Sequence, residues 1–429
     1  MAKLSSIAYY VTDKISSNDI SLAEYVTTDC ILQNKKGREV ATNLPPQPCS
    51  LIRYQRGDVL IANIRPYLKK VWFADIDGGA SPDVLVFRAK DGHSPSFLYA
   101  ILLQDSFFDY VMQGTKGSKM PRGDKEQILR YEMPTFSCSE ESIGTFFLNL
   151  DRKIHLNERI NQNLEAMAKQ LYNYWFVQFD FPNEEGKPYK SSGGKMVWNE
   201  KLKREIPFGW HCGNLFEIAV FTNGLACQKF RPKDDEASLP VIKIREMHDG
   251  ISADTEKVTP NIPESVKVYN GDVLFSWSAS LEVMLWAYGL GGLNQHIFKV
   301  TSANDFPKSF FYFQLLDYVD VFKKMAEARK TTMGHITQDH LQQSAIAIPD
   351  NKDIADRFEE LISPIFNQII KLHEEILNLT KQRDKLLPLL MNGQVSVNSD
   401  LAVLYIIYGL KYQNYEREHH SGDSCENAA

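Results

Sequence analysis

The sequence predicts an α/β fold made by internal duplication, in which two α/β globules are joined by two long antiparallel helices. Three observations lead to this prediction. Landmark sequences recur in one order along the two halves of the chain, each half contains short aromatic and β-branched runs typical of strands, and each half ends in a heptad pattern typical of a paired helix. We therefore expect the 429 residues to form one unit used twice, with an internal pseudo-two-fold repeat.

The duplication is carried by an ordered series of matches. Four pairs of landmarks share residue types and order: 3–8 (KLSSIA) with 213–219 (GNLFEIA), 57–61 (GDVLI) with 271–275 (GDVLF), 97–103 with 311–316, and the apolar strands that end at Pro134 and Pro349. A Gly-Asp turn before a strand is common and explains a single match. Four matches in register indicate duplication instead.

The composition of each globule favours an α/β fold. Aromatic and β-branched runs predict strands, and shorter helical patterns lie between them. The expected strands include 71–73, 84–87, 239–244 and 283–286, and the expected helices are 96–112 and 308–328.

Each half then continues into a long helical pattern with the alternating spacing of three and four that marks a heptad seam. In the first half the seam residues are Phe147, Leu150, Ile154, Asn157, Asn161, Leu164, Ala168, Leu171 and Trp175, and in the second half they are Ile362, Ile365, Ile369, Leu372, Ile376, Leu379, Arg383, Leu386 and Leu390. Each helix is the other's nearest candidate partner, although each stripe could instead pack only on its own globule. Asn157 and Asn161 are polar inserts of the kind that fix register. Ser363 and Pro364 resemble a helix start, and Pro388 with Gly393 marks its end.

These patterns divide the chain into six segments. We expect a first globule at 1–138, a first helix at 139–179, a linker at 180–205, a second globule at 206–350, a second helix at 351–397 and a tail at 398–429. The linker is inferred because the stretch is polar and rich in Pro, Gly and Ser. The tail holds an apolar piece at 401–410, which is either an extra helix capping the helix pair or an altered reading frame.

Composition excludes several protein classes. With 43% hydrophobic and 24% charged residues and a net charge of −6, the chain has the profile of a globular protein of several domains. The late apolar run at 402–410 is too short to cross a bilayer, and no cleavable signal pattern opens the chain, so we expect a cytoplasmic protein. The six cysteines are far apart and form no CxxC pair, which favours reduced thiols over a zinc site or a disulfide framework.

Catalytic signatures are missing from the sequence. There is no phosphate-binding loop, no dinucleotide fingerprint at 289–292, no HExxH pair and no Asn-Pro-Pro-Tyr type motif at 43–47. The Pro-Asp pairs at Asp83 and Asp350 lack the acidic-x-Lys partners of a nuclease site, and His419 and His420 lie in a polar tail typical of solvated residues. We therefore expect a chain that is not itself an enzyme and binds neither a metal nor a cofactor.

Two basic segments at equivalent places in the repeats are the candidate DNA-binding sites. Basic residues mixed with Gly, Ser and Thr suit phosphate contacts, because small residues let backbone N–H groups approach. The candidates are Lys116, Lys119, Arg122 and Lys125 in the first half, and Lys323, Lys324, Arg329, Lys330, Thr331 and Thr332 in the second. Because the net charge is negative, DNA binding is expected to be confined to such local patches.

Three stretches carry a family resemblance: 163–180 (NLEAMAKQLYNYWFVQFD), 206–210 (IPFGW) and 386–395 (LLPLLMNGQV). With the duplicated layout, they resemble the specificity subunits of type I restriction–modification enzymes, over about residues 1–397. The resemblance implies that the globules are target-recognition domains, each reading one half of a split, asymmetric DNA site. It implies that the two helices are spacers that dock two modification subunits.

The resemblance also implies what the partners supply. The modification subunits would bring S-adenosylmethionine and methylate adenine, and restriction subunits would bring ATP-dependent, Mg-requiring cleavage of double-stranded DNA. Two alternatives stay open, namely a coiled-coil scaffold without DNA binding and a stand-alone DNA methyltransferase or nuclease. Helices paired over about 24 residues span roughly 36 Å at 1.5 Å per residue, which is close to one turn of B-DNA.

Overall fold

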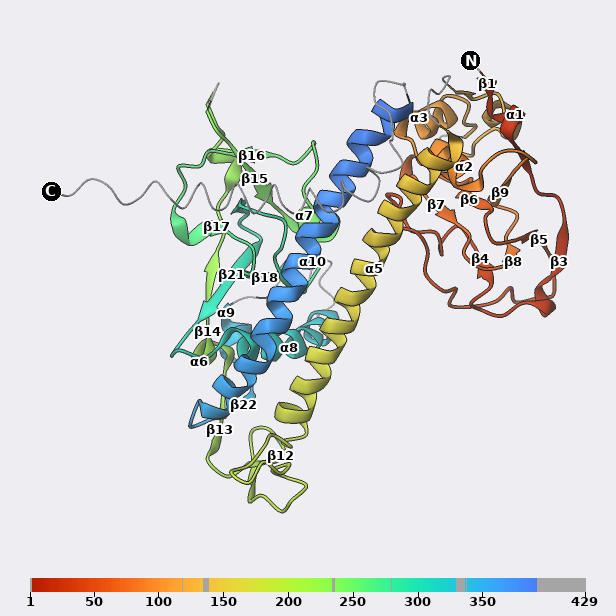
Figure 1. Cartoon of the computed structure of the whole chain (residues 1–429). Coiled ribbons are helices and arrows are strands. Elements are labelled where there is room, and N and C mark those ends of the chain that lie inside the picture. Colours follow the sequence, from red (N-terminus) through yellow and green to blue (C-terminus); the bar gives the residue numbers. More distant parts are fainter. Residues whose placement is uncertain are drawn as a thin grey trace. The chain divides into compact units, whose positions relative to one another are not determined.

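The computed structural model describes residues 2–117, 119–133, 139–233, 236–278, 280–328, 336 and 338–391. The chain forms two compact units, the first from Met1–Leu156 with Asn378–Ala429 and the second from Asn157–Leu377. Two long helices, α5 (Glu140–Tyr172) and α10 (Asp353–Met391), each contribute to both units (Figure 1). Among the described residues, no helix combines the length and apolar character needed to span a membrane.

The first unit contains two four-stranded sheets and a two-stranded one. Its strands are β1 (Ala2–Lys3), β2 (Ala8–Tyr10), β3 (Lys14–Ser16), β4 (Tyr25–Val26), β5 (Ser50–Tyr54), β6 (Val59–Ala62), β7 (Val71–Phe73), β8 (Gly78–Ala80), β9 (Val84–Ala89) and β10 (Glu132–Met133). Its shorter helices are α1 (Leu4–Ile7), α2 (Pro95–Leu102), α3 (Asp105–Gln113) and α4 (Lys125–Ile128). The sheet orders are β2-β9-β6-β7, β3-β5-β8-β4 and β1-β10.

The second unit repeats this plan. Its strands are β11 (Met196–Asn199), β12 (Arg204–Pro207), β13 (Trp210–Gly213), β14 (Ala219–Asn223), β15 (Leu239–Ile242), β16 (Lys257–Val258), β17 (Lys267–Val268), β18 (Val273–Ser276), β19 (Glu282–Leu285), β20 (Gly291–Leu293), β21 (Ile297–Ser302) and β22 (Ile346–Pro349). Its shorter helices are α6 (Leu215–Ile218), α7 (Ile244–Asp249), α8 (Lys308–Ala328) and α9 (Gln338–Gln342). The sheet orders are β14-β21-β18-β19, β16-β15-β20-β17, β13-β22 and the β11-β12 hairpin.

The strand topology confirms the duplicated fold. The antiparallel order β2-β9-β6-β7 recurs as β14-β21-β18-β19, and the outer pair β1-β10 recurs as β13-β22. In the other sheet, β5-β8-β4 corresponds to β17-β20-β15, with one antiparallel and one parallel pairing in each copy. The copies differ at the sheet edges, since β3 adds to β5 in the first unit and β16 adds to β15 in the second. The helices also differ, because α8 is continuous where the first unit has α2 and α3 in place of the single helix predicted at 96–112.

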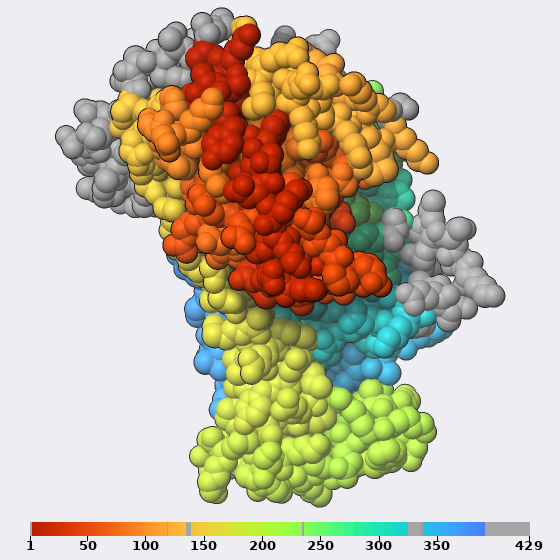
Figure 2. All heavy atoms as spheres, turned by 90° about the vertical axis from the view of Figure 1, so that its right-hand side faces the viewer, coloured from red at the N-terminus to blue at the C-terminus, as the bar shows by residue number. Residues whose placement is uncertain are grey.

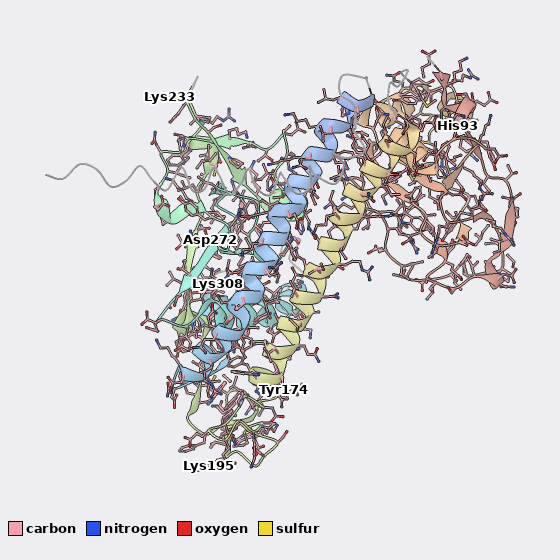
Figure 3. All side chains as sticks on the ribbon, viewed as in Figure 1. His93, Tyr174, Lys195, Lys233, Asp272 and Lys308 are labelled. Atoms are coloured by element: carbon pink, nitrogen blue, oxygen red, sulfur yellow. The ribbon has the colours of Figure 1, made fainter. Side chains whose placement is uncertain are left out.

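The Gly-Asp turn before β6 and β18 has the same construction in both units. Gly57 and Gly271 have φ values of 93° and 89°, which glycine adopts without a side-chain clash. The Asp58 carboxylate accepts the Gln55 amide at 2.8 Å, and Asp272 accepts the Tyr269 amide at 2.8 Å. In the second unit, Lys308 Nζ also donates to the Gly271 carbonyl at 2.7 Å. Figure 3 labels Lys308 and Asp272, the residue after Gly271. This motif is repeated because each copy needs a fixed left-handed turn to enter its central strand.

The helices α5 and α10 pair in opposite directions within each unit. In the second unit Asn157 Nδ2 donates to Glu375 Oε2 at 2.8 Å, and Asn161 Nδ2 lies 3.0 Å from His373 Nδ1. In the first unit Arg383 donates to Asp151 at 3.2 Å. Partners rise along α5 as they fall along α10, so the pairing is antiparallel.

Most predicted seam positions face the interior. Leu150, Ile154, Asn157, Asn161, Ile369, Leu372 and Leu379 are buried, whereas Leu164, Leu171, Ile376 and Leu386 are partly buried. Near the helix ends, Tyr172 and Leu387 are buried in place of Leu171 and Leu386. The buried stripe shifts by one residue there because the helices also pack on the globules. Tyr172, for example, stacks on Phe313 of α8 at 5.1 Å between ring centroids.

The start of α10 differs from the expectation based on Ser363 and Pro364. The helix begins ten residues earlier, at Asp353, where the Asn351 side chain accepts the Asp353 amide at 3.0 Å. It continues through Pro364 because Ala355, Phe358 and Ile362 are buried in the core of the second unit. Burial of this apolar face outweighs the hydrogen bond that a proline removes from a helix.

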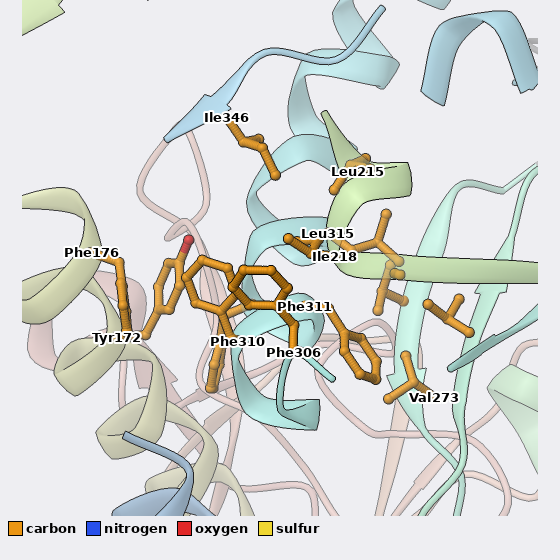
Figure 4. Close-up of a cluster of buried hydrophobic side chains, with 14 of the residues drawn as sticks. Tyr172, Phe176, Leu215, Ile218, Val273, Phe306, Phe310, Phe311, Leu315 and Ile346 are labelled. Atoms are coloured by element: carbon orange, nitrogen blue, oxygen red, sulfur yellow. The ribbon is translucent and has the colours of Figure 1, made fainter. Parts of the chain in front are cut away.

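The main core of the second unit joins α5, α8 and α10 to the sheet β14-β21-β18-β19. Figure 4 shows Tyr172 and Phe176 of the first long helix and its π-helical extension (Asn173–Val177) next to Phe310 and Phe311 of α8. Ile346 of β22 and Leu215 of α6 complete this side of the cluster. The C-terminal part of α5 thus packs on the second globule as well as on α10, a contact that neither alternative for the seam predicted.

Residues 180–205 differ from the expected linker, because they fold against the end of α5. Phe181 is buried, and its ring stacks on Trp210 at 5.7 Å and on Tyr189 at 4.8 Å between centroids. The hairpin β11-β12 follows, and Figure 2 shows the segment as a compact yellow-green lobe. Aromatic side chains within a polar stretch supply a small core that composition alone does not reveal.

Candidate DNA-binding interface

The basic loop of the first unit is joined by isolated β-bridges to the turn after β6, and we call these two segments, residues 63–67 and residues 116–117 with 119–123, the ribbon. Lys116 and Arg122 exchange two backbone hydrogen bonds of 3.1 and 3.2 Å, and Arg122 also bridges to Ile64. The Arg65 amide donates to the Pro121 carbonyl at 2.8 Å. The ribbon therefore begins where β6 ends and ends where α4 begins.

Its four predicted cations are all exposed. Lys116 and Arg122 have side-chain exposures of 85% and 57% and form ion pairs with Asp124 at 3.2 Å and Asp83 at 3.1 Å. Lys119 and Lys125 are also exposed, and among the described residues their ammonium groups have no hydrogen-bonding or ionic partner. The structure thus brings Lys116, Lys119 and Arg122 together on one ribbon and places Lys125 on the adjoining helix.

Asp124 fixes the junction between the ribbon and α4. Its carboxylate accepts the Glu126 and Gln127 amides at 3.0 and 3.1 Å, as an N-cap residue does. The Gln127 amide, followed by the Lys116 ammonium, lowers the pKa of Asp124. The charged form of Asp124 therefore holds the end of the basic loop against the globule.

The second basic segment differs from the predicted loop. Lys323 and Lys324 lie on the last turns of α8, where both are exposed and Lys323 lies 3.8 Å from Asp320. The local sequence Lys-Lys-Met-Ala-Glu-Ala has high helix propensity and forms the end of this helix. Arg329, Lys330, Thr331 and Thr332 lie outside the described residues.

The two segments remain structurally equivalent at their far ends. The Gly123 amide donates to the Asn63 carbonyl at 3.3 Å, directly after β6. The Ile336 amide donates to the Trp277 carbonyl at 3.0 Å, directly after β18. Gly123 and Ile336, each of which follows the helix of its unit, therefore contact the end of the central strand in the same way.

Sequence reasoning missed three exposed residues on the ribbon of the first unit. Arg65 is exposed, and Tyr67 and Met120 each have 50% exposure. Arg65 and Tyr67 flank Pro66 directly after β6, which is a signal for a turn at a strand end. Arg65 and Tyr67 were missed because they lie far from the basic loop in the sequence, and only the backbone hydrogen bond from Arg65 to Pro121 places them beside it.

No group of three or more His, Cys, Asp and Glu side chains suitable for a metal ion occurs in the part of the chain that the structure describes.

Comparison with known proteins shows what the chain is similar to. Residues 207–380 match the type I restriction modification DNA specificity domain. The chain is 24% identical over 397 residues to the type I restriction enzyme MjaIX specificity subunit of Methanocaldococcus jannaschii, covering 89% of this chain and 86% of that protein. It is 22% identical over 457 residues to the HindI specificity subunit of Haemophilus influenzae, covering 91% and 98%.

The chain therefore resembles type I specificity subunits over most of its length. The resemblance predicted from the sequence is therefore confirmed. A solved S subunit of a type I restriction–modification system from M. genitalium has the same fold, with a TM-score of 0.56 and 12% identity over 91% of this chain and 95% of that one. The family domain covers the second globule and most of α10, and the curated relatives extend the match over both halves.

Proposed function

We propose that this chain is the sequence-specific DNA-recognition subunit of a type I restriction–modification enzyme. Each globule reads one half of a bipartite, asymmetric target. The observation that carries the proposal is the duplication: a chain that resembles DNA specificity subunits contains two copies of one unit. Copies that share a scaffold but differ in their loops suit two different half-sites.

Binding on the first half-site begins with phosphate contacts. The exposed lysines of the ribbon and α4 neutralise backbone phosphates and release counterions, which makes affinity depend on salt. Such contacts set the position of the protein on the duplex, while base contacts set the sequence. Because the whole chain carries a net charge of −6, duplex binding depends on these local cations.

The proposal assigns methyl transfer and cleavage to partner subunits. S-adenosylmethionine belongs to the two modification subunits, and ATP and Mg belong to the restriction subunits, with this chain providing DNA binding and docking surfaces. Chromosomal DNA as the substrate places the complex in the cytoplasm. The missing catalytic motifs support this division over a stand-alone methyltransferase or nuclease.

The outer face of α5 supports docking of a modification subunit. Ile160, Met167 and Tyr174 are 37%, 51% and 37% exposed and lie seven residues apart, so they share one face of the helix and its extension. The repeat-related positions of Ile160 and Met167 on α10 are the polar Glu375 and Gln382. Exposed apolar side chains in a row mark a protein contact, and we place one of the two modification subunits here.

Substitution on this face tests the docking proposal. Met167→Asp places a charge on the apolar row and should sharply reduce co-purification of the methyltransferase subunits with the full chain. Gln162→Asp, on another face of the same helix, is the matched control and should leave co-purification unchanged. Equal recovery of partners with both variants would contradict the assignment.

Selection of duplexes from a random library tests the recognition function. The full chain with its partners should enrich two fixed half-sites separated by unread base pairs. Lys119→Ala combined with Lys125→Ala should weaken binding to all sequences and reduce the dependence of log affinity on log salt by about 0.9 per lost phosphate contact. The control, Lys190→Ala with Lys201→Ala, removes two exposed lysines from outside the ribbon and should change neither.

The library also separates the alternatives. A scaffold without DNA binding would give no enrichment and no salt-sensitive binding with any duplex. A stand-alone enzyme would show methyl transfer or cleavage by the purified chain in the absence of partners.

A further inference from the structure

The turn after β6 holds Arg65 in an unusual backbone conformation. Arg65 and Lys69 have φ values of 53° and 51°, in the left-handed region, on either side of a short 3₁₀ helix (Pro66–Leu68). Residues other than glycine, asparagine and aspartate seldom adopt this region, and they do so mainly where the surrounding structure imposes it at functional sites. The turn is therefore an imposed conformation that needs an explanation.

Contacts on both sides impose it. The Arg65 amide is held by the Pro121 carbonyl at 2.8 Å, and the Leu68 amide donates back to the Arg65 carbonyl at 2.9 Å. On the other side, the Asn34 amide donates to the Leu68 carbonyl at 2.8 Å, and Lys69 Nζ lies 2.9 Å from an Asp105 oxygen. The backbone of the turn is thus fixed before any ligand arrives.

The Arg65 side chain differs from the other arginine of the ribbon. Arg122 is ion-paired with Asp83, whereas the Arg65 guanidinium has no hydrogen-bonding or ionic partner among the described residues. Tyr67 and Met120, each 50% exposed, present apolar surface on the same ribbon. The ribbon therefore combines an unpaired planar donor group with apolar side chains and exposed lysines.

We propose that Arg65 is a base-reading residue of the first recognition domain and that it contacts guanine. The proposal rests on the recognition function proposed above. In the major groove guanine presents two acceptors, N7 and O6, that match the fork of donors on a guanidinium. Tyr67 and Met120 supply the neighbouring apolar contacts, and Lys119 contacts the phosphates that fix the ribbon on the duplex.

Arg65 variants test this assignment through the sites methylated in cells that carry the full chain and its partner subunits. Arg65→Gly removes the guanidinium and keeps the left-handed turn, which glycine adopts readily. It should reduce the preference for guanine at one position of one half-site by about 5- to 150-fold, the range of one bidentate base contact. Arg65→Gln should shift that position towards adenine, the base that glutamine pairs with, while the other half-site stays unchanged.

Arg53→Ala is the matched control, because Arg53 is an exposed arginine on β5 in the other sheet of the same unit. It should leave both half-sites unaltered. Uniform weakening over all sequences with Arg65→Gly would show a phosphate contact and overturn the proposal, and so would an unchanged site. If the wild-type complex itself has no bipartite preference, the recognition function fails, which is a different result from loss of the Arg65 assignment alone.

Discussion

His211 on β13 ties the two ends of the second globule together. Its Nδ1 lies 2.6 Å from Asp350, directly after β22, and its Nε2 lies 3.2 Å from Glu217 of α6. Burial lowers the pKa of His211, but the hydrogen bonds with Asp350 and Glu217 outweigh burial and raise the pKa above its usual value. The protonated imidazolium therefore joins two carboxylates that belong to opposite ends of the domain.

This arrangement predicts a pH-dependent contribution to stability. A pKa raised by folding gives stabilisation that is fully present below the unfolded pKa of about 6.5 and is lost as pH rises through the folded pKa. His211→Gln should lower the unfolding temperature by at most about 2–4 °C at pH 5.5. The difference should shrink as the pH is raised past the folded pKa in thermal scans. A difference that is constant or grows with pH would contradict the ion-pair explanation.

At the scale of elements, the two long helices occupy equivalent places in the two repeats, but the residues at their contacts differ. A shift of about 215 residues places Asp151 of α5 at the position of Phe366 on α10, and Arg383 of α10 at the position of Ala168 on α5. Arg383 and Asp151 are 4% and 7% exposed, and the Tyr99 hydroxyl donates to Asp151 at 2.7 Å. In the second unit the equivalent places hold apolar residues of the main core.

The pKa of Asp151 reflects this environment. Burial raises it, but the bond with His155 and the charge of Arg383 outweigh burial, and the net pKa lies below its usual value. The buried carboxylate is therefore ionised and depends on its cationic partners. We infer that the first unit joins the helices through a polar network, whereas the second unit joins them mainly by apolar packing.

Removing one partner should be more damaging than replacing the network. Arg383→Ala leaves the buried Asp151 carboxylate without its guanidinium partner and should reduce the free energy of unfolding by about 3–5 kcal/mol. The triple variant Tyr99→Phe, Asp151→Leu and Arg383→Met, which copies the apolar character of the second unit, should recover most of that loss. Denaturant unfolding of the variants measures both values, and a triple variant less stable than Arg383→Ala would argue against this account.

At the scale of the whole molecule, the helices are the covalent connections between the two units. The unit boundary crosses α5 between Leu156 and Asn157 and crosses α10 between Leu377 and Asn378. On the second-unit side, α5 and α10 share one core, to which Ala168, Tyr172, Phe366 and Ile369 belong. The two helices therefore have to change length together if the spacing between the recognised half-sites is to change.

A paired insertion tests whether the helices set that spacing. Sequence reasoning predicts that four residues added near Leu164 of α5 lengthen the unread spacer. The shared core calls for a matching turn in α10, between Ile369 and Leu372. Each added turn lengthens its helix by about 6 Å, so the unread spacer should grow by about one or two base pairs while both half-sites are kept. Mapping of methylated sites reads the spacer, and an unaltered spacer in an active complex would refute the idea.

Only part of the candidate interface could be predicted from the sequence. Lys116, Lys119, Arg122 and Lys125 follow from local composition, because a basic loop rich in Gly and Ser is visible in a single stretch. Arg65 lies about 50 residues earlier and joins them only through a backbone bond to Pro121. Lys323 and Lys324 belong to a helix because their neighbours favour one, which the analogy with the first loop did not reveal.

The duplication, the heptad helices, the strand entries and the family resemblance of this protein could all be predicted from the sequence. These features depend on the order of nearby residues and on hydrophobic periodicity. Burial of one face of a helix or strand imposes that periodicity on the sequence. Tertiary structure alone decided that Asp151 meets Arg383 across 232 positions of sequence, that residues 180–205 fold on aromatic side chains, and that Arg65 joins the basic loop. Pairing over such separations leaves no period in the sequence, because it depends on which surfaces folding brings together.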